Sequence, residues 1–458
     1  MDRLCALLYD ADDAAADNAA ADNAANGKSS LFTDLAIPPP NTHTDDIATL
    51  LSKYDKLNMR YATSTLITSN NTIPTNAIKS QIINHNVTND HDIVTIYMRG
   101  YTIVYNNVIH VRKVNYRDIS YDTQMKICVR VLNVDHHDDP NGIVFRPLAG
   151  LLRKISANNG DGKRNRWIIE LSHCTNIEEL CANDNRGITE CAPFATSLRI
   201  LSATLNCGIS NRGLQSCTNI VNLDASHNNN ITTCEPFAKT LQILSAESSC
   251  GISDEGIERC ANIKVLNANN NSRITTCAPF AASLRILFAR DSCGISDEGI
   301  ARCINIEAFH VGDNERITTC RPFAGSLRKL NVGARCGITD DGLRLCMSIK
   351  ELYTQSAKIT LCDPFAKSLR TLYAYMPSCG ISDDGLRQCT NIKILSAHNN
   401  PRITTCNPFA KSLESLNASE SCGITDYGLR LCNNIKQLCV YKNDKITITM
   451  NDILYRKK

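Results

Sequence analysis

The chain has 458 residues, with 49 lysines and arginines against 46 acidic residues. The net charge of +3 gives no strong field that would attract nucleic acid or an anionic membrane. No apolar run approaches the roughly 18 to 20 residues that cross a bilayer. We therefore expect neither nucleic acid nor a membrane among the partners.

The 23 cysteines would suggest a disulfide framework in a short secreted chain. Met1, however, opens onto acidic, alanine-rich sequence without a basic segment or a long apolar core, so no secretory signal is indicated. We interpret the thiols as reduced and expect a cytoplasmic protein, with the nucleus as the alternative location.

The N-terminal quarter divides into two predicted regions. Residues 11–26 are almost entirely alanine, aspartate and asparagine, so we expect a disordered tail over residues 1–30. Residues 31–110 are predicted to form a linker and a cap, with one helix around residues 46–57. Between Ile93 and Val114 the β-branched and aromatic residues become dense, which predicts strands that shield the first repeat.

Three ladders of cysteines then mark an internal repeat. The first two ladders have a period of 43 residues, and the third keeps that period within one residue. The first ladder is Cys207, Cys250, Cys293, Cys336, Cys379 and Cys422; the second is Cys217, Cys260, Cys303, Cys346, Cys389 and Cys432; the third is Cys191, Cys234, Cys277, Cys320, Cys362 and Cys406. Chance does not produce three such registers.

Each period contains two units. Strand leucines such as Leu223, Leu244, Leu266 and Leu287 alternate at spacings of 21 and 22 residues. Both spacings lie within the range of about 20 to 29 residues that is typical of leucine-rich repeats. Within a unit the apolar residues at positions one, four and six predict a short strand whose large side chains point inward, while the others face the concave side.

The rest of each unit predicts a turn and a short helix. Ser253 and Asp254 can cap one such turn, Pro279 suits the first position of the next short helix, and we expect Gly251 and Gly256 to serve turns. Strand positions continue back from Leu438 through Leu180 to two degenerate units; these carry Ile155 and Leu132. The segment 158–166 looks like an inserted loop.

The predicted fold class is therefore α/β. We expect a leucine-rich-repeat solenoid, a horseshoe with a parallel concave sheet and short convex helices, over residues 111–458. It should contain about 15 units in 43-residue pairs.

The stretch Cys250-Gly-Ile-Ser-Asp-Glu-Gly-Ile257, followed by Cys260-Ala-Asn-Ile263-Lys-Val-Leu266, resembles the cysteine-containing subfamily of leucine-rich repeats. That subfamily is familiar from F-box substrate receptors and from their F-box-less relatives of the antagonist-of-mitotic-exit type. The resemblance covers roughly residues 114 to 450 and implies recognition of a protein partner. The N-terminal region lacks the leucine-proline start and the late tryptophan of an F-box.

Catalytic and cofactor chemistry finds little support. Structural zinc needs four converging ligands, commonly from close cysteine pairs, whereas these cysteines are spaced as small apolar core residues. The stretch from Gly251 to Gly256 imitates a phosphate loop, but Ile257 stands where the lysine should be. His227, His310 and His398 keep no fixed distance to a cysteine, so we expect them to be surface residues. We predict no enzyme, no metal and no cofactor.

The concave positions vary between repeats, so they can form a binding surface that is specific for one partner. The residue after each strand leucine gives one row of such positions: Ser202, Asp224, Ser245, Asn267, Phe288, His310, Asn331, Tyr353, Tyr373, Ser396, Asn417 and Cys439. Aromatic residues gather in its C-terminal half. Tyr353, Tyr373 and Tyr375 are predicted to form an exposed partner-binding cluster, with Phe288, His310 and His398 nearby and with Arg290, Lys329 and Glu351 as charged contacts.

The alternative for these tyrosines is that they pack only against one another. For the whole chain we predict a non-enzymatic protein–protein interaction scaffold. Two alternatives stay open. One is a substrate-recognition subunit of a ubiquitin ligase, with ligase components as partners of residues 1–110, and the other is a self-associating structural protein.

Overall fold

A computed structural model describes residues 152–158 and 171–452 in full, together with the backbone of short strands between residues 94 and 170. Contacts divide the chain into two compact units. The first comprises residues 1–137 and 160–162, and the second comprises residues 138–159 and 163–458. The predicted tail, the predicted helix at 46–57 and most of the predicted loop at 158–166 lie outside the described residues.

The first unit contains the strands that were predicted between Ile93 and Val114. Strand β1 (Val94–Tyr97) pairs antiparallel with β2 (Thr102–Tyr105), which pairs antiparallel with β3 (His110–Val111). On its other side β1 pairs parallel with β4 (Val129–Asn133), which carries the predicted strand position Leu132. The degenerate repeat at Leu132 is therefore a strand.

The second unit is built on one sheet of 14 parallel strands. The strands are β6 (Lys154–Ser156), β8 (Glu179–Cys181), β9 (Ile200–Ser202), β10 (Asn222–Asp224), β11 (Ile243–Ser245), β12 (Val265–Asn267), β13 (Ile286–Phe288), β14 (Ala308–His310), β15 (Lys329–Val332), β16 (Glu351–Thr354), β17 (Thr371–Ala374), β18 (Ile394–Ser396), β19 (Ser415–Asn417) and β20 (Gln437–Cys439). Strands β5 (Ile143–Val144) and β7 (Ile169–Glu170) form a separate parallel pair.

The strand leucines are in register along this sheet. Leu244 pairs with Leu223 on one side and with Leu266 on the other, and Leu266 pairs with Leu287. All four side chains are fully buried. The prediction of stacked, parallel leucine-rich repeats is confirmed.

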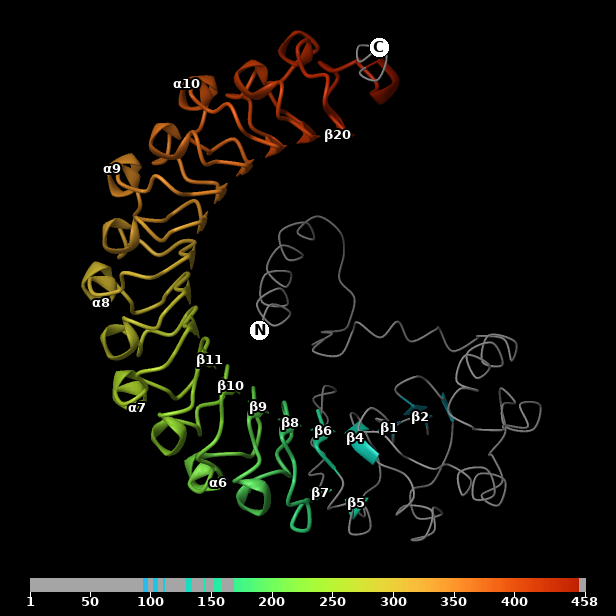
Figure 1. Cartoon of the computed structure of the whole chain (residues 1–458), viewed down its shortest axis with the longest axis vertical. Coiled ribbons are helices and arrows are strands. Elements are labelled where there is room, and N and C mark those ends of the chain that lie inside the picture. The colour runs from blue at the N-terminus through green and yellow to red at the C-terminus, as the bar shows by residue number, and fades with distance from the viewer. Residues whose placement is uncertain are drawn as a thin grey trace, which may run out of the picture. The chain divides into compact units, whose positions relative to one another are not determined.

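One-turn helices occupy the other side of each unit. Within the second unit the strands line the inner, concave side of an arc and the helices lie on its outer, convex side (Figure 1). The α-helices are α6 (Asn211–Leu214), α7 (Asp254–Ile257), α8 (Asp297–Ile300), α9 (Asp340–Leu343) and α10 (Asp383–Leu386); the 3-10 helices are η3 (Ala192–Phe194), η4 (Glu235–Phe237), η5 (Ala278–Phe280), η6 (Arg321–Phe323), η7 (Asp363–Phe365), η8 (Asn407–Phe409) and η9 (Tyr427–Leu429). Among the described residues, no helix has the length and apolar character needed to span a membrane.

The helix starts differ in part from the prediction. Pro279 lies in the first turn of η5, as expected. Ser253 precedes α7, but its side chain forms no capping hydrogen bond, so that part of the prediction is wrong. The Asp254 carboxylate instead accepts hydrogen bonds from the next unit, at 2.8 Å from the Thr275 amide and 2.6 Å from the Thr275 hydroxyl. The side chain joins two units rather than closing its own turn.

The cysteine ladders lie in the core. Every cysteine of the described residues is buried except Cys439. Burial raises the pKa of the Cys207 thiol to about 12 and that of the Cys250 thiol to about 11, so both stay protonated at neutral pH. Cys234 and Cys260 hydrogen-bond to each other, and this bond together with burial raises the pKa of Cys234. These thiols serve as small packing groups, as predicted.

Buried asparagines in every second unit bind the unit before it. The Asn271 amide nitrogen donates to the carbonyls of Ala246, at 2.7 Å, and Ile252, at 3.2 Å. Its oxygen accepts from the backbone amide of Arg273 at 2.9 Å. Asn185, Asn228, Asn314, Asn400 and Asn443 make the equivalent bonds to preceding carbonyls. Buried backbone carbonyls that have no partner in the short strands thus accept hydrogen bonds from these side chains.

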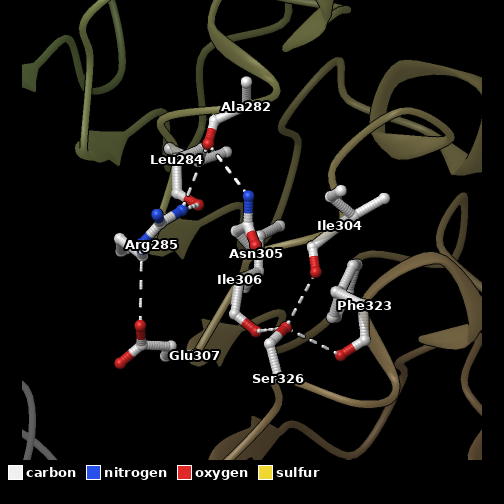
Figure 2. A network of polar contacts seen from close by, with 9 residues as sticks. All are labelled: Ala282, Leu284, Arg285, Ile304, Asn305, Ile306, Glu307, Phe323 and Ser326. Carbon is white, nitrogen blue, oxygen red and sulfur yellow. Dashed lines mark hydrogen bonds and ion pairs between the residues drawn. The ribbon is translucent and has the colours of Figure 1, made fainter.

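A second polar network follows the flank on which the strands begin. The Ser326 hydroxyl lies 3.1 Å from the Ile304 carbonyl and 2.8 Å from the Ile306 carbonyl, and the Asn305 amide donates to the Ala282 carbonyl at 3.0 Å (Figure 2). Arg285 lies on the same flank, facing Glu307 at 3.6 Å. The flank therefore also links neighbouring units by side-chain hydrogen bonds.

The repeated glycines are needed for close approach between units. A Cβ atom at Gly251 would lie 2.6 Å from the Asn229 carbonyl oxygen, and one at Gly256 would lie 2.1 Å from the Thr232 carbonyl oxygen. The carbonyl of Gly256 in turn accepts from the amide of Cys234 at 2.8 Å. Any side chain here would push two units apart. Gly256 lies inside α7, so the expectation that it serves a turn is wrong, whereas Gly251 lies at a bend.

We predict that Gly256→Ala lowers the free energy of unfolding by about 2 to 3 kcal/mol, because the methyl group overlaps the Thr232 carbonyl. The matched control is Gly325→Ala, since a Cβ at Gly325 meets nothing within 4 Å. This control should stay within about 0.5 kcal/mol of the wild type. Urea unfolding of both variants measures the difference, and equal stabilities would contradict the close-approach explanation.

Candidate functional site

The predicted row of concave side chains forms one continuous line across the sheet. Each member pairs in register with the next, from Ser202 on β9 to Cys439 on β20. Phe288, His310, Asn331, Tyr353 and Tyr373 occupy five successive strands, β13 to β17. Successive strands lie about 4.8 Å apart, so neighbouring side chains in the row touch.

The N-terminal half of the concave face is polar and bonded to itself. The Ser202 hydroxyl lies 2.7 Å from the side-chain oxygen of Asn183, and the hydroxyls of Ser226 and Ser245 lie 2.9 Å apart. Burial raises the pKa of the Asp224 carboxyl, against hydrogen bonds from Ser226 and Ser245. This half presents short, mutually satisfied groups rather than large anchors.

Phe288 and His310 differ from the expectation of exposed side chains. Their relative exposures are 2% and 4%, and their rings stack with centroids 4.4 Å apart. Burial lowers the pKa of His310 to about 3, with further lowering by the positive charges of Lys329 and Arg290. The prediction that His310 is a surface residue is therefore wrong. It is a neutral, packed ring at physiological pH.

Lys329, Glu351, Tyr353 and Tyr373 form the half-buried centre of the row. The two tyrosines pair across β16 and β17, and their rings stack 4.5 Å apart at an interplanar angle of 8°. The Lys329 ammonium lies 5.0 Å from the Tyr353 ring centre and 3.6 Å from the Glu351 carboxylate. A cation, an anion and two stacked phenols thus share one patch, which we call the tyrosine patch.

Tyr375 and Arg290 lie one row further along the strands. Tyr375 comes directly after β17 and is half-buried. Arg290 follows β13, and its Nε would be 3.0 Å from a Cβ at Gly312, so the absent side chain at Gly312 makes room for the guanidinium. Its charge acts on His310, which brings Arg290 into the same group as the aromatic row.

His398 follows β18 and is half-buried. Its Nε2 lies 3.7 Å from the Glu420 carboxylate of the next unit. His227 is exposed, as predicted. The ion pair of His398 is therefore made with the unit that follows it and not with a residue of the tyrosine patch.

The tyrosine patch coincides with a break in the regular backbone. In most units from β8 to β20, the residue four positions after the strand leucine has a positive φ. The units of β15 and β16 are exceptions. In the unit of β17 this residue is Met376, and its φ is 79°. There the strands gain a fourth residue, with Val332, Thr354 and Ala374 in register. The tyrosines therefore lie where the concave face changes its local geometry.

The unit of β16 also lacks two of the repeated asparagines. Ser356 takes the place of the buried asparagine, and Ser348 takes the place of the asparagine on the flank. The Ser356 hydroxyl accepts from the Lys358 amide at 3.1 Å, and the Lys358 ammonium donates to the Cys336 carbonyl at 3.0 Å. The spacing of strand leucines, 20 residues from Leu352 to Leu372 and then 23 to Leu395, is the signal of this irregularity in the sequence.

The concave face around the tyrosine patch carries aromatic and charged side chains. Within the described residues, no group of three or more histidine, cysteine, aspartate or glutamate side chains is placed to hold a metal ion. What the face presents around the tyrosine patch is aromatic surface, phenol hydroxyls and both signs of charge. Such groups recognise another surface through stacking, hydrogen bonds and ion pairs.

The fold described above is that of a leucine-rich-repeat solenoid. No protein-family model matches the chain, and no curated protein sequence matches it. Among solved structures, an internalin from Listeria monocytogenes matches with a TM-score of 0.43 and 20% identity, over 64% of this chain and 82% of that one. The complex of Rad7 and Elc1 in yeast matches with a TM-score of 0.33 and 12% identity, over 56% and 73%. The fold assignment rests on strand register and repeat geometry rather than on these matches.

We predict a pH-dependent stability that is specific to His310. The folded pKa is about 3 against 6.5 for the free side chain, so between these values the unfolded chain binds a proton that the folded chain excludes. The contribution of neutral His310 to the free energy of unfolding is complete above pH 6.5. It is lost as the pH falls from 6.5 toward 3, by at most about 1.4 kcal/mol per pH unit. Urea unfolding at pH 7 and pH 5 should show a larger loss for the wild type than for His310→Gln. Equal losses would contradict a buried neutral His310.

Proposed function

We propose that the chain is a non-enzymatic scaffold that binds a protein partner on its concave face, centred on the tyrosine patch of β15 to β17. The observation that carries this proposal is the stacked pair Tyr353 and Tyr373, placed where the repeat backbone departs from its period. Cysteine-containing repeats of the F-box type, which the sequence resembles, also bind protein partners, and we propose that this chain is related to them.

Half-buried tyrosines suit this role physically. Each ring offers a large apolar surface and a polar hydroxyl, and the side chain has little conformational entropy to lose on binding. The stack fixes both rings before a partner arrives, which reduces the cost of ordering them. Lys329 and Glu351 add charges that can select the partner by sign.

The alternative reading, in which the tyrosines pack only against each other, predicts a different outcome for their removal. A purely structural stack would change the stability of the solenoid and leave partner binding intact. An interface anchor would change binding far more than stability, since a few central aromatic residues commonly carry most of the binding energy.

We expect the triple variant Tyr353→Ala, Tyr373→Ala and Tyr375→Ala to weaken partner binding by about 2 kcal/mol or more. The partner is first identified by photo-crosslinking from benzoylphenylalanine placed at Tyr353, and its affinity for each variant is then measured by titration calorimetry. The matched control carries Tyr427→Ala and Tyr441→Ala, which remove two tyrosines that are 66% and 64% exposed. Equal affinities for the two variants would overturn the assignment of the site.

Two further functions stay as hypotheses. A ubiquitin-ligase adaptor would co-purify with ligase subunits through residues 1–110, a region that lies largely outside the described residues. A self-associating structural protein would form oligomers in a concentration-dependent manner with the tyrosine patch covered. A cytoplasmic location, with the nucleus as the alternative, belongs to the proposal as well.

A further inference from the structure

A run of basic residues lies at the beginning of four neighbouring strands. Arg328, Lys350, Arg370 and Lys393 directly precede β15, β16, β17 and β18. Backbone hydrogen bonds fix them side by side: Lys350 donates to the Arg328 carbonyl at 2.7 Å, Arg370 to Lys350 at 2.8 Å, and Lys393 to Arg370 at 2.7 Å. We call this set the basic edge.

The preceding repeat shows what this position looks like when its charge is balanced. Arg285 directly precedes β13, and its guanidinium donates to the carbonyls of Ala282 and Leu284, at 3.3 and 3.2 Å. Glu307 of the next strand faces it at 3.6 Å (Figure 2). In this repeat the arginine is held by backbone carbonyls and neutralised by its neighbour.

In the next two repeats the arginine is held in the same way, but the sign of its neighbour is reversed. Arg328 donates to the carbonyls of Gly325 and Leu327, at 2.9 and 3.1 Å. Arg370 donates to those of Lys367 and Leu369, at 3.0 and 3.1 Å. The positions equivalent to Glu307 are now Lys350 and Lys393. Like charges opposite each other on neighbouring strands destabilise a sheet.

Little within the described residues offsets these charges. On these strands the ion pairs involve Arg285, Lys329, Lys393 and Lys436, and among the described side chains none involves Arg328, Lys350 or Arg370. Three cations on consecutive strands thus lack a carboxylate within salt-bridge distance in this part of the chain. An anion supplied from outside would relieve their mutual repulsion.

The basic edge is short, because an acidic residue stands at each end. Glu307 directly precedes β14, one strand before Arg328, and Glu414 directly precedes β19, one strand after Lys393. Four strands at about 4.8 Å span only about 14 Å. A nucleic-acid backbone carries phosphates beyond that length, and the two glutamates would repel them. A short acidic stretch of protein fits the spacing better.

Apolar side chains lie on the same flank. Ile304 and Met347 are 62% and 68% exposed and precede Glu307 and Lys350 by three residues. The Ser326 hydroxyl donates to the Ile304 carbonyl, as drawn in Figure 2, and the Ser368 hydroxyl donates to the Met347 carbonyl. The flank therefore combines cations with exposed aliphatic surface, which fits a segment that carries both acidic and large apolar side chains.

We propose that the basic edge binds a short acidic segment of a protein partner, whose carboxylates lie on Arg328, Lys350 and Arg370 and whose apolar side chain lies on Met347. The inference rests on the proposed scaffold function and names the chemistry of its partner. The basic edge adjoins the tyrosine patch directly, because Lys329 and Glu351, the first residues of β15 and β16, follow Arg328 and Lys350 in the chain.

The test uses the full chain and a fluorescein-labelled peptide of about ten residues that combines glutamates with two leucines, long enough to span the four strands. Fluorescence anisotropy should show binding that weakens as salt is added. Lys350→Glu should weaken binding roughly tenfold. The matched control is Lys264→Glu, which makes the same change at the same position of a unit two periods earlier, also at an exposed lysine but next to the balanced pair of Arg285 and Glu307.

Lys350→Glu should also raise the midpoint of thermal unfolding, because it places an anion between Arg328 and Arg370, so weaker binding will not reflect misfolding. No binding by the wild type, or equal binding by the Lys350→Glu and Lys264→Glu variants, overturns the inference. So does a single-stranded oligonucleotide of equal charge that binds as tightly as the peptide.

The same titration separates this inference from the proposed function. The basic edge is supported if peptide binding survives the removal of Tyr353 and Tyr373 but is lost with Lys350→Glu. This holds even if the affinity of the partner found by crosslinking does not depend on the tyrosine patch. A partner that needs the tyrosines but binds the Lys350→Glu variant normally supports the scaffold and overturns the basic edge.

Discussion

The contact between one repeat and the next governs everything else in this molecule. A strand of three or four residues with a one-turn helix cannot shelter its own leucine, so each unit buries its core against its neighbours. The approach is close enough that Gly251 and Gly256 have no room for a side chain. At this distance carbonyls that would otherwise be buried without a partner accept hydrogen bonds from Asn271 and its equivalents. Packing and hydrogen bonding are thus satisfied by the same contact.

Because that contact fixes the register, it also decides where function can lie. Side chains that point inward are committed to the core, and the helices, cysteines and glycines repeat because the stack needs them. Variation falls on solvent-facing positions, among them the concave rows and the flank where strands begin. The tyrosine patch and the basic edge occupy these two places on the same strands, where the period of the repeat is itself disturbed. Both proposed sites therefore lie where the repeat departs from its regular spacing.

The fold could be predicted from the sequence because its cause is periodic. The spacing of Leu223, Leu244 and Leu266 fixed the strands, and the row from Ser202 to Cys439 came out in register, since alternation along a strand leaves little freedom. Contacts between particular side chains could not be predicted in this way. The burial of Phe288 and His310 depends on ring stacking across two strands, and the bond of Asp254 to Thr275 depends on how far one unit reaches over the next. Periodicity reports which face a residue occupies, not what covers it.

The change from Glu307 to Lys350 was also present in the sequence, at an interval of one period. It had no meaning until backbone hydrogen bonds placed both residues beside equivalent arginines. Charge reversals of this kind can be found by aligning the repeats of one chain with each other, provided that the strand register is known. The comparison of repeats within a chain replaces part of what an alignment of relatives would supply.

The buried thiols have a consequence for how motion in the solenoid can be observed. Each two-unit period seals its cysteines between neighbours, and burial raises the pKa of thiols such as Cys207 and Cys250. An alkylating reagent can therefore reach these thiols only when that part of the stack opens. Every period therefore carries its own chemical reporter of local opening. The order in which the cysteines of different periods become labelled would map, period by period, where the solenoid opens.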